Sequence, residues 1–236
     1  MYFKLKEFVK TRLPFVGCIV GAIRNPVFFL KSPEGRFAAI YKNNTWGDAL
    51  SRSGSGSNLT ETEVVRAMLP VIIEELKCQS ILDIPCGDFF WMKLVEVDIH
   101  YTGGDIVTDM VRRNHDLYGD TKRKFVKMNI VDGSLAKADL VLCRDCLVHL
   151  SFKDIFQALR NVKNSGSVYF LTTTFTGLER NANIITGDWR PINLQKAPFS
   201  FPQPMKIINE KCPSEGFSDK SLGLWRVADI PDYEKL

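Results

Sequence analysis

The stretch LDIPCGDF at residues 82–89 decides the fold. It closes a short apolar segment, residues 80–84, with an acid, a turn and a single glycine. A second apolar segment, residues 101–106, ends in GGDI, which places Asp105 22 positions after Asp83. Strands that end in this way are typical of parallel sheets, in which the residues beyond the carboxyl ends of the strands meet at one ligand-binding edge.

Apolar strands alternate with helical periodicities along the rest of the chain. The spacing predicts strands over 80–84, 101–106, 124–130, 138–143, 167–173, 205–210 and 222–228. It predicts helices over 60–76, 89–95, 108–117 and 152–162, the first with a capping box formed by Thr60 and Glu63. Because parallel strands need crossover connections that cover both faces of the sheet, this order predicts a doubly wound α/β fold.

Composition limits the class of protein. The 236 residues are 45% hydrophobic and 25% charged, enough apolar side chains to bury a full core. The net charge of +4 is uneven: residues 1–31 hold six basic side chains against one acidic, and the remainder holds 25 against 26. A nearly neutral body argues against nucleic acid as the main partner, because binding phosphates needs a basic face on the domain itself.

The basic leader, residues 1–36, is set apart from a single domain over 37–236. Its apolar run, residues 13–23, is interrupted by Pro14 and Gly17 and is shorter than the roughly 20 residues that cross a bilayer. We expect it to dock on the body, with a basic interfacial helix as the alternative. A weak peripheral contact of residues 1–31 with the inner membrane surface, in a cytoplasmic protein, is the location that this charge pattern favours.

The six cysteines do not resemble a disulfide framework. They are scattered through a chain that can build a core without cross-links, which favours a reducing cytoplasm. Cys143 and Cys146 form one C-x-x-C pair, but a structural zinc site needs a second pair at similar spacing, and the sequence has none. We therefore expect no metal.

The strand-end residues indicate which nucleoside is bound. A carboxylate at Asp105 suits the two hydroxyls of a ribose, because one carboxylate can accept both O–H groups. A dinucleotide would need three glycines for its pyrophosphate, and here Pro85 and Phe89 stand where two would be. Asp83 and Asp88 would repel phosphate but attract an ammonium and a sulfonium, so S-adenosylmethionine (SAM) is favoured over NAD.

The sequence resembles the class I SAM-dependent methyltransferases from about Trp46 onward. DIPCGDF, GxDI, RDCLVHL and TGxWRxxNL are similar to a bacterial and algal-virus subgroup associated with O-methylation of glycans. The resemblance implies a mostly parallel sheet with a reversed C-terminal strand. It implies that the cofactor is bordered by Asp83, Pro85, Gly87, Asp88, Asp105, Ile106, Asn129, Ile130 and Arg144, with Asn129 standing where the family has an adenine-binding acid.

Two irregular stretches lie outside the expected helices and strands. Residues 41–58 are rich in Ser, Gly and Asn and read as an ordered loop or linker; by resemblance Trp46, Ser53 and Gly54 would cover the cofactor as a lid. Residues 175–204 are too long for an idle loop, so we expect a substrate loop there. Its candidates for holding a sugar are Asn183, Trp189, Arg190 and Asn193, and the alternative is a surface loop that Trp189 anchors.

The turn after residues 138–143 supplies the expected catalytic group. Methyl transfer to a hydroxyl needs alignment and removal of a proton. His149, with an ordinary pKa of ~6.5, can accept that proton, and Asp145 is the other candidate base or an orienting group. We therefore expect a SAM-dependent O-methyltransferase acting on a sugar or glycan. The alternatives are methylation of a small metabolite or protein side chain, a non-catalytic SAM-binding module and an NAD-dependent oxidoreductase.

Overall fold

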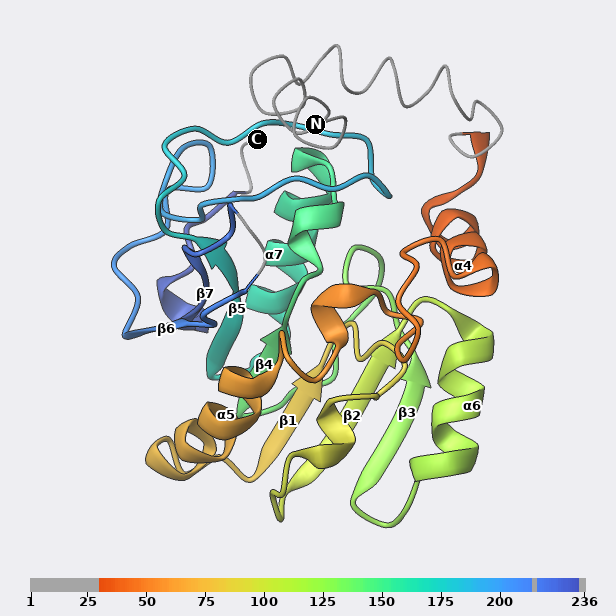
Figure 1. Ribbon diagram of the computed structural model, residues 1–236. Helices are drawn as coiled ribbons and strands as arrows, with labels where there is room; N and C mark the ends of the chain where they lie inside the picture. Colours follow the sequence, from red (N-terminus) through yellow and green to blue (C-terminus); the bar gives the residue numbers. More distant parts are fainter. Residues whose placement is uncertain (1–29, 214–215, 234–236) are drawn as a thin grey trace.

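The structure is a computed structural model that describes residues 30–213 and 216–233. Its centre is a seven-stranded sheet in the order β3-β2-β1-β4-β5-β7-β6 (Figure 1). The strands are β1 (Ser80–Asp83), β2 (His100–Asp105), β3 (Arg123–Lys127), β4 (Leu140–Cys143), β5 (Tyr169–Phe175), β6 (Lys206–Asn209) and β7 (Lys220–Arg226). The longer helices are α4 (Pro33–Asn43), α5 (Glu63–Glu75), α6 (Thr108–Tyr118) and α7 (Phe152–Asn164), with short turns of 3₁₀ helix η1 (Ser55–Ser57), η2 (Met92–Leu94), η3 (Leu147–His149) and η4 (Val227–Asp229).

The expected doubly wound topology is confirmed. Strands β1 to β5 pair in parallel, while β7 runs antiparallel to both β5 and β6. Strand order reverses at β1, because the chain moves outward to β2 and β3 and then returns to β4 on the other side. A ligand crevice is expected beyond the carboxyl ends of the strands at such a reversal.

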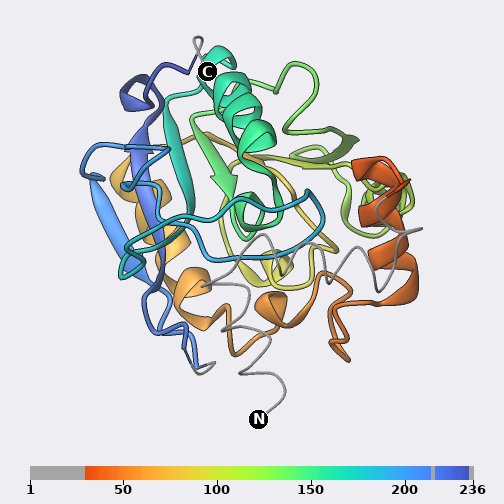
Figure 2. The same ribbon diagram turned by 90° about the horizontal axis from the view of Figure 1, so that it is seen from above.

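Both faces of the sheet are buried. Successive residues of each central strand enter opposite clusters: Leu82 and Val141 pack with α7, whereas Ile81 and Leu140 pack with α5. Helix α6 lies on the same side as α5, and α7 lies on the opposite side (Figures 1 and 2). This explains why the strands read as continuous apolar runs rather than as alternating ones.

Three local predictions are corrected. The helix expected over residues 89–95 is only the turn η2, because Phe89 has φ of 60°, outside the helical region. The capping box expected at Thr60 does not form: α5 begins at Glu63, and no side chain caps it. Residues 41–43 of the expected 41–58 loop belong to α4, which no sequence expectation included.

Helix α4 lies beyond the carboxyl edge of the sheet (Figure 1). Ser32 caps it by accepting a hydrogen bond from Gly35 N, Pro33 stands in its first turn, and Asn44 ends it in a left-handed conformation. Arg36 donates to Thr186 O at 2.6 Å, so this helix is tied to the body. The domain boundary expected between residues 36 and 37 therefore falls inside a docked helix.

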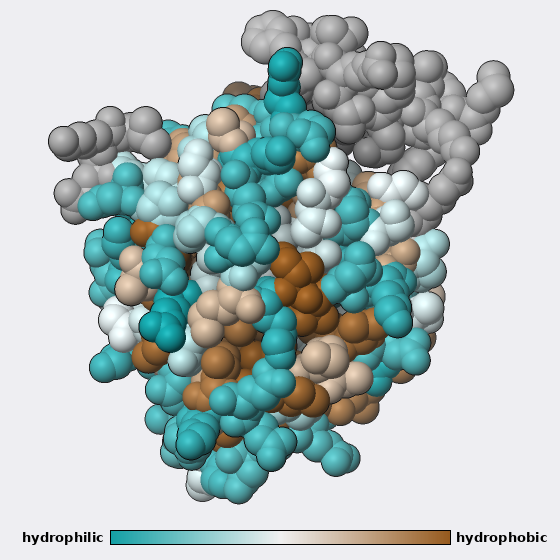
Figure 3. All heavy atoms as spheres, turned by 90° about the vertical axis from the view of Figure 1, so that its left-hand side faces the viewer, coloured by the Kyte–Doolittle hydropathy of each residue, from teal (hydrophilic) through white to brown (hydrophobic). Residues whose placement is uncertain are grey.

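The expected basic leader falls mostly outside the described residues, which begin at residue 30. No helix in the described part of the chain is both long enough and apolar enough to cross a membrane. The edge of the sheet opposite β3 is formed by the short strand β6, which contains the exposed Ile207 and follows the exposed Met205. Viewed from that side, hydrophobic residues lie among hydrophilic ones on the surface (Figure 3).

Candidate functional site

A cavity of about 720 Å³ lies beyond the carboxyl ends of β1, β2 and β4. Its floor is the turn after β1 and the ends of β2 and β4, and its cover comes from α4 and residues 45–57. Gly87 lies in the floor with φ of 57°, and a Cβ there would approach Ser53 Oγ to 2.5 Å. Only glycine therefore allows both this turn and the close approach of the covering loop.

Asp83 and Asp105, at the ends of β1 and β2, line the cavity and are buried. Tyr101 donates its hydroxyl to Asp83 Oδ2 at 2.7 Å, and burial raises the pKa of Asp83 to about 7 despite that bond. Asp105 accepts the backbone N–H of Val107 at 2.9 Å and of Gly87 at 3.2 Å, and burial raises its pKa to about 6. A carboxylate has about four acceptor positions, so each acid can accept further hydrogen bonds from a ligand.

Apolar side chains and one amide continue the wall beyond β2. Ile106, Asn129 and Ile130 line the cavity as expected, and Met110 and Met128 line it too. Asn129 accepts Val131 N at 3.0 Å through its amide oxygen, which leaves its amide nitrogen as the end that can donate to a ligand. This part of the cavity suits a flat, largely apolar ring with a polar edge.

Asp88, expected beside the cofactor, is not among the residues that line the cavity. Its carboxylate accepts hydrogen bonds from Ser51 Oγ, Arg52 N and Ser53 Oγ, between 2.8 and 3.2 Å. Ser53 Oγ in turn accepts Asp88 N at 2.9 Å. Asp88 thus anchors the covering loop to the turn after β1.

The covering loop includes the three residues expected in it. Trp46, Ser53 and Gly54 line the cavity, with the Trp46 side chain over the ring of His149 at 5.0 Å between centroids. Gly54 has φ of 92°, and a Cβ there would lie 3.0 Å from Trp46 Cβ. Pro85, in the turn below, also lines the cavity.

His149 lies at the end of η3 and faces the cavity. Its Nδ1 lies 2.8 Å from Asp188 O. Because a carbonyl oxygen can only accept, Nδ1 carries the proton and Nε2 carries the lone pair in the neutral ring. Burial lowers the pKa of His149 below its usual 6.5, against the opposing effects of Asp188 and Asp145. The imidazole is therefore neutral and able to accept a proton at neutral pH.

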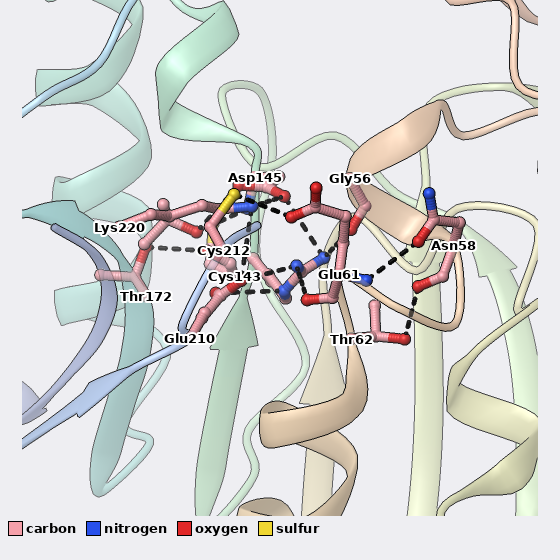
Figure 4. Close-up of polar contacts among 12 residues, drawn as sticks. Gly56, Asn58, Glu61, Thr62, Cys143, Asp145, Thr172, Glu210, Cys212 and Lys220 are labelled. Carbon is pink, nitrogen blue, oxygen red and sulfur yellow. Dashed lines mark hydrogen bonds and ion pairs between the residues drawn. The ribbon is translucent and has the colours of Figure 1, made fainter. Parts of the chain in front are cut away.

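Asp145 differs from His149 although both lie in the same turn. Its Oδ2 is 2.7 Å from Lys220 Nζ (Figure 4). The same oxygen is 3.3 Å from a guanidinium nitrogen of Arg144. Burial would raise the pKa of Asp145, but Lys220 and Arg144 outweigh it and lower the pKa to about 2. An acid this strong is a poor base for a hydroxyl. Asp145 is thus an ion-paired residue of the cavity wall.

Arg144 borders the cavity, but its donors are engaged by the chain. Its Nε and Nη2 donate to Glu210, at 3.2 and 2.7 Å; Nη2 also reaches Glu61 O at 3.4 Å, and Nη1 donates to Gly56 O at 2.7 Å. Arg144 and Glu210 are both buried. The side chain therefore ties the covering segment to the sheet at the cavity wall.

The expected substrate loop has no helix or strand between residues 176 and 205, and only one of its four candidates lines the cavity. Trp189 does so, with its ring against Phe175 and Phe217. Arg190 donates to Leu147 O, Leu150 O and Ala182 O.

The two candidate asparagines of the loop, Asn183 and Asn193, also serve the backbone. Asn183 accepts Phe152 N and Ile184 N, and Asn193 donates to Thr176 O and Leu178 O. Asn183, Arg190 and Asn193 therefore hold the loop in shape, because a long irregular segment must satisfy its backbone groups without a ladder.

Several residues of the site were not predicted from the sequence. Phe37 and Tyr41 of α4, Phe175, Phe217 and Lys220 all line the cavity. The signal for α4 was available, since Ser32-Pro33 at its start and Asn44 at its end are ordinary helix boundaries. Lys220 and Phe217 are far from the turn after β4 in sequence, and only the insertion of β7 beside β5 brings them there.

The fold is that of the class I methyltransferases. No protein-family model matches the chain, and no curated protein matches it in sequence. Among solved structures, human N-acetylserotonin methyltransferase in complex with SAM superposes with a TM-score of 0.57 at 12% identity, over 92% of this chain and 68% of that one. The N-methyltransferase NodS from Bradyrhizobium japonicum, in complex with S-adenosylhomocysteine, gives 0.57 at 12% identity, over 82% of this chain and 99% of that one.

Proposed function

We propose that the protein is a SAM-dependent methyltransferase that methylates a hydroxyl group. The observation that carries the proposal is one cavity that holds two buried strand-end acids, Asp83 and Asp105, and a neutral imidazole, His149. The methyltransferase fold supports it, because the two structures compared above hold SAM and its demethylated product.

The residues present fit SAM. Asp105 would accept the ribose hydroxyls with the acceptor positions that Val107 N and Gly87 N leave, and Asp83 would accept from the ammonium of the methionine part. Ile106, Ile130 and Asn129 would enclose the adenine. The ammonium of bound SAM would lower the pKa of Asp83 and keep it ionised, without a cation of the chain in direct contact.

The chain's own part in the reaction is to align the acceptor and remove a proton. SAM, when bound, would supply the methyl group, because its positively charged sulfur is a good leaving group from the methyl carbon. His149 would take the proton of the acceptor hydroxyl on Nε2. Asp188 O, at Nδ1, and the ionised Asp145 would stabilise the imidazolium that results. The covering loop and α4 would exclude water.

We propose a sugar hydroxyl, in a polysaccharide or glycolipid precursor, as the acceptor. The resemblance of the sequence motifs to the glycan-associated subgroup supports it, as do the aromatic rings of Trp189, Phe175 and Phe217 at the cavity, which suit the C–H face of a sugar. The loop amides no longer add support, because the backbone uses them. A small metabolite or a protein side chain is the other acceptor class.

Two measurements test this function. Titration calorimetry should detect SAM binding and no NAD binding, and the reverse result would overturn the proposed cofactor. Release of S-adenosylhomocysteine should then occur with glycan acceptors in a panel that also holds phenolic metabolites and peptides. Turnover only with a phenolic metabolite or a peptide would refute the sugar acceptor but support methyl transfer. SAM binding without turnover would favour a non-catalytic binding module.

We also propose that the protein is cytoplasmic and associates weakly with anionic membranes through residues 1–31. The support is their net charge of +5 on an otherwise neutral chain, and each basic residue contributes at most about 1 kcal/mol at such a surface. Replacing Lys4, Lys6 and Lys10 by Gln should reduce cosedimentation with vesicles of anionic lipid. Equal binding of this variant and the wild type would refute the contact.

A further inference from the structure

Two aromatic rings hold the imidazole of His149. The Trp46 ring lies over it at 5.0 Å with 31° between the planes, and the Phe37 ring meets it edge-on at 6.5 Å and 86°. The Nδ1 bond to Asp188 O fixes a third direction. Stacked and edge-on aromatic contacts of this kind have preferred geometries, so together they select one orientation of the imidazole.

Trp46 is itself held in place by the turn after β1. Asp88 binds Ser51, Arg52 and Ser53, and the loop then passes Gly54, whose Cα lies so near Trp46 that an added Cβ would be 3.0 Å from Trp46 Cβ. A series of contacts therefore joins Asp88, in the turn after β1, to the ring that covers His149.

We propose that Trp46 is a positioning residue, which acts on the reaction by holding the His149 ring with its Nε2 toward the acceptor and shielded from water. The inference rests on the proposed function, in which His149 is the base. It changes the role of Trp46 from a cover over the cofactor to a support for the base, and it makes Phe37 of α4 the second support.

Charged groups near the imidazole do not depend on Trp46. Asp145 in the turn after β4 and Asp188 in the loop raise the pKa of His149, and Arg190 lowers it. On α4, Arg36 binds Thr186 O. Removal of the Trp46 ring leaves all of these in place and exposes the imidazole to water, so the change in His149 isolates the effect of Trp46.

The test is a proton NMR titration of the ligand-free protein, which has 3 histidines, with His149→Gln to assign the His149 signals. In Trp46→Ala these signals should lose the upfield ring-current shift, and the pKa of His149 should rise toward ~6.5. In Trp46→Phe both should be partly restored. Leu50→Ala, an exposed apolar truncation in the same loop, is the matched control and should change neither.

Kinetics provide the second readout. In Trp46→Ala, kcat should fall about two- to tenfold, the range that a lost aromatic contact of ~0.5–1.5 kcal/mol gives, with KM for SAM nearly constant. Unchanged His149 signals in Trp46→Ala would overturn the proposal, and so would a loss of SAM affinity that accounts for the whole effect. If Trp46→Ala alters the His149 signals but the wild-type protein methylates no acceptor, the result would instead contradict the proposed function.

Discussion

Asp145 and His149 lie in the same turn, but their electrostatic environments differ: Asp145 is ionised and His149 is neutral. Cations of the chain compensate the charge of Asp145, whereas His149 is buried beside aromatic rings and a carbonyl oxygen. The sequence made both candidates for the base, because it does not show which one Lys220 reaches. The choice between them needed contacts between residues 75 positions apart.

His149→Gln should lower kcat by about 10²- to 10⁴-fold, the usual contribution of a general base. SAM affinity should stay within about twofold, since His149 is separate from the two strand-end acids. Single-turnover kinetics and calorimetry measure the two quantities. Asp145→Asn serves as the comparison variant, and a larger loss of the chemical step there than in His149→Gln would reverse the assignment.

Activity should depend on pH through His149. Burial lowers its pKa below 6.5, so the neutral, proton-accepting ring predominates at pH 7 and is lost as pH falls through that lowered value. The profile of kcat against pH should therefore be flat near neutrality and fall on the acid side with unit slope. A flat profile down to the acid unfolding of the protein would argue against a histidine base.

Asp105→Ala should weaken SAM binding by about 1–3 kcal/mol, because the ligand's hydroxyls would be buried without partners. The same change also removes the acceptor for Val107 N and Gly87 N. Asp105→Asn, which keeps an acceptor oxygen, should lose less. Calorimetry on both variants, with the thermal midpoint recorded beside it, decides; full affinity in Asp105→Ala would contradict the ribose contact.

At the scale of elements, the sequence predicted the strands, which follow a regular apolar pattern. It did not predict the conformation of the turns and loops, which depends on contacts with residues distant in sequence. All seven strands were predicted, because runs such as Ile81-Leu82 and Val141-Leu142 are apolar on both faces. The helix expected at residues 89–95 failed since Phe89 adopts a positive φ in the turn below the cavity. The loop amides of Asn183 and Asn193 were expected to bind sugar, but they form hydrogen bonds with backbone groups of the loop and its neighbours.

Asp88→Ala should release the covering loop from the turn after β1. The change removes the acceptor for Ser51, Arg52 and Ser53, so we expect faster hydrogen exchange at Arg52 N and SAM binding weakened by about 1–2 kcal/mol. Asp116→Ala, an exposed carboxylate on α6, is the matched control. Unchanged exchange at Arg52 N would show that the loop is held by other contacts.

At the scale of the molecule, stability and site share the buried pair of Arg144 and Glu210. Their salt bridge, at 2.7 Å, links β4's following turn to the segment after β6, and the same guanidinium reaches the covering segment at Gly56 O. Removing Arg144 would leave the buried Glu210 carboxylate with the more distant Lys220, at 3.4 Å, in place of its closest cation. The pair therefore contributes to the fold as a whole and not only to the cavity wall.

Arg144→Met should lower the free energy of unfolding by about 3–5 kcal/mol in urea denaturation, because Glu210 remains buried. Lys206→Met, which removes the exposed salt bridge with Glu75 beside the edge strand β6, should cost less than about 1 kcal/mol. Equal losses in the two variants would show that the position of the charge inside the molecule does not matter here.

The insertion of β7 between β5 and β6 has a consequence for biosynthesis. Lys220, which pairs with Asp145, is the first residue of β7. The strand β7 forms backbone hydrogen bonds with both β5 and β6. While the ribosome is still adding residues before β7, the nascent chain already contains the covering loop, the strand-end acids and His149. Its cavity wall nevertheless stays open, and β5 presents an unpaired edge to other chains. Until β7 is made, this edge is a site at which the nascent chain can aggregate.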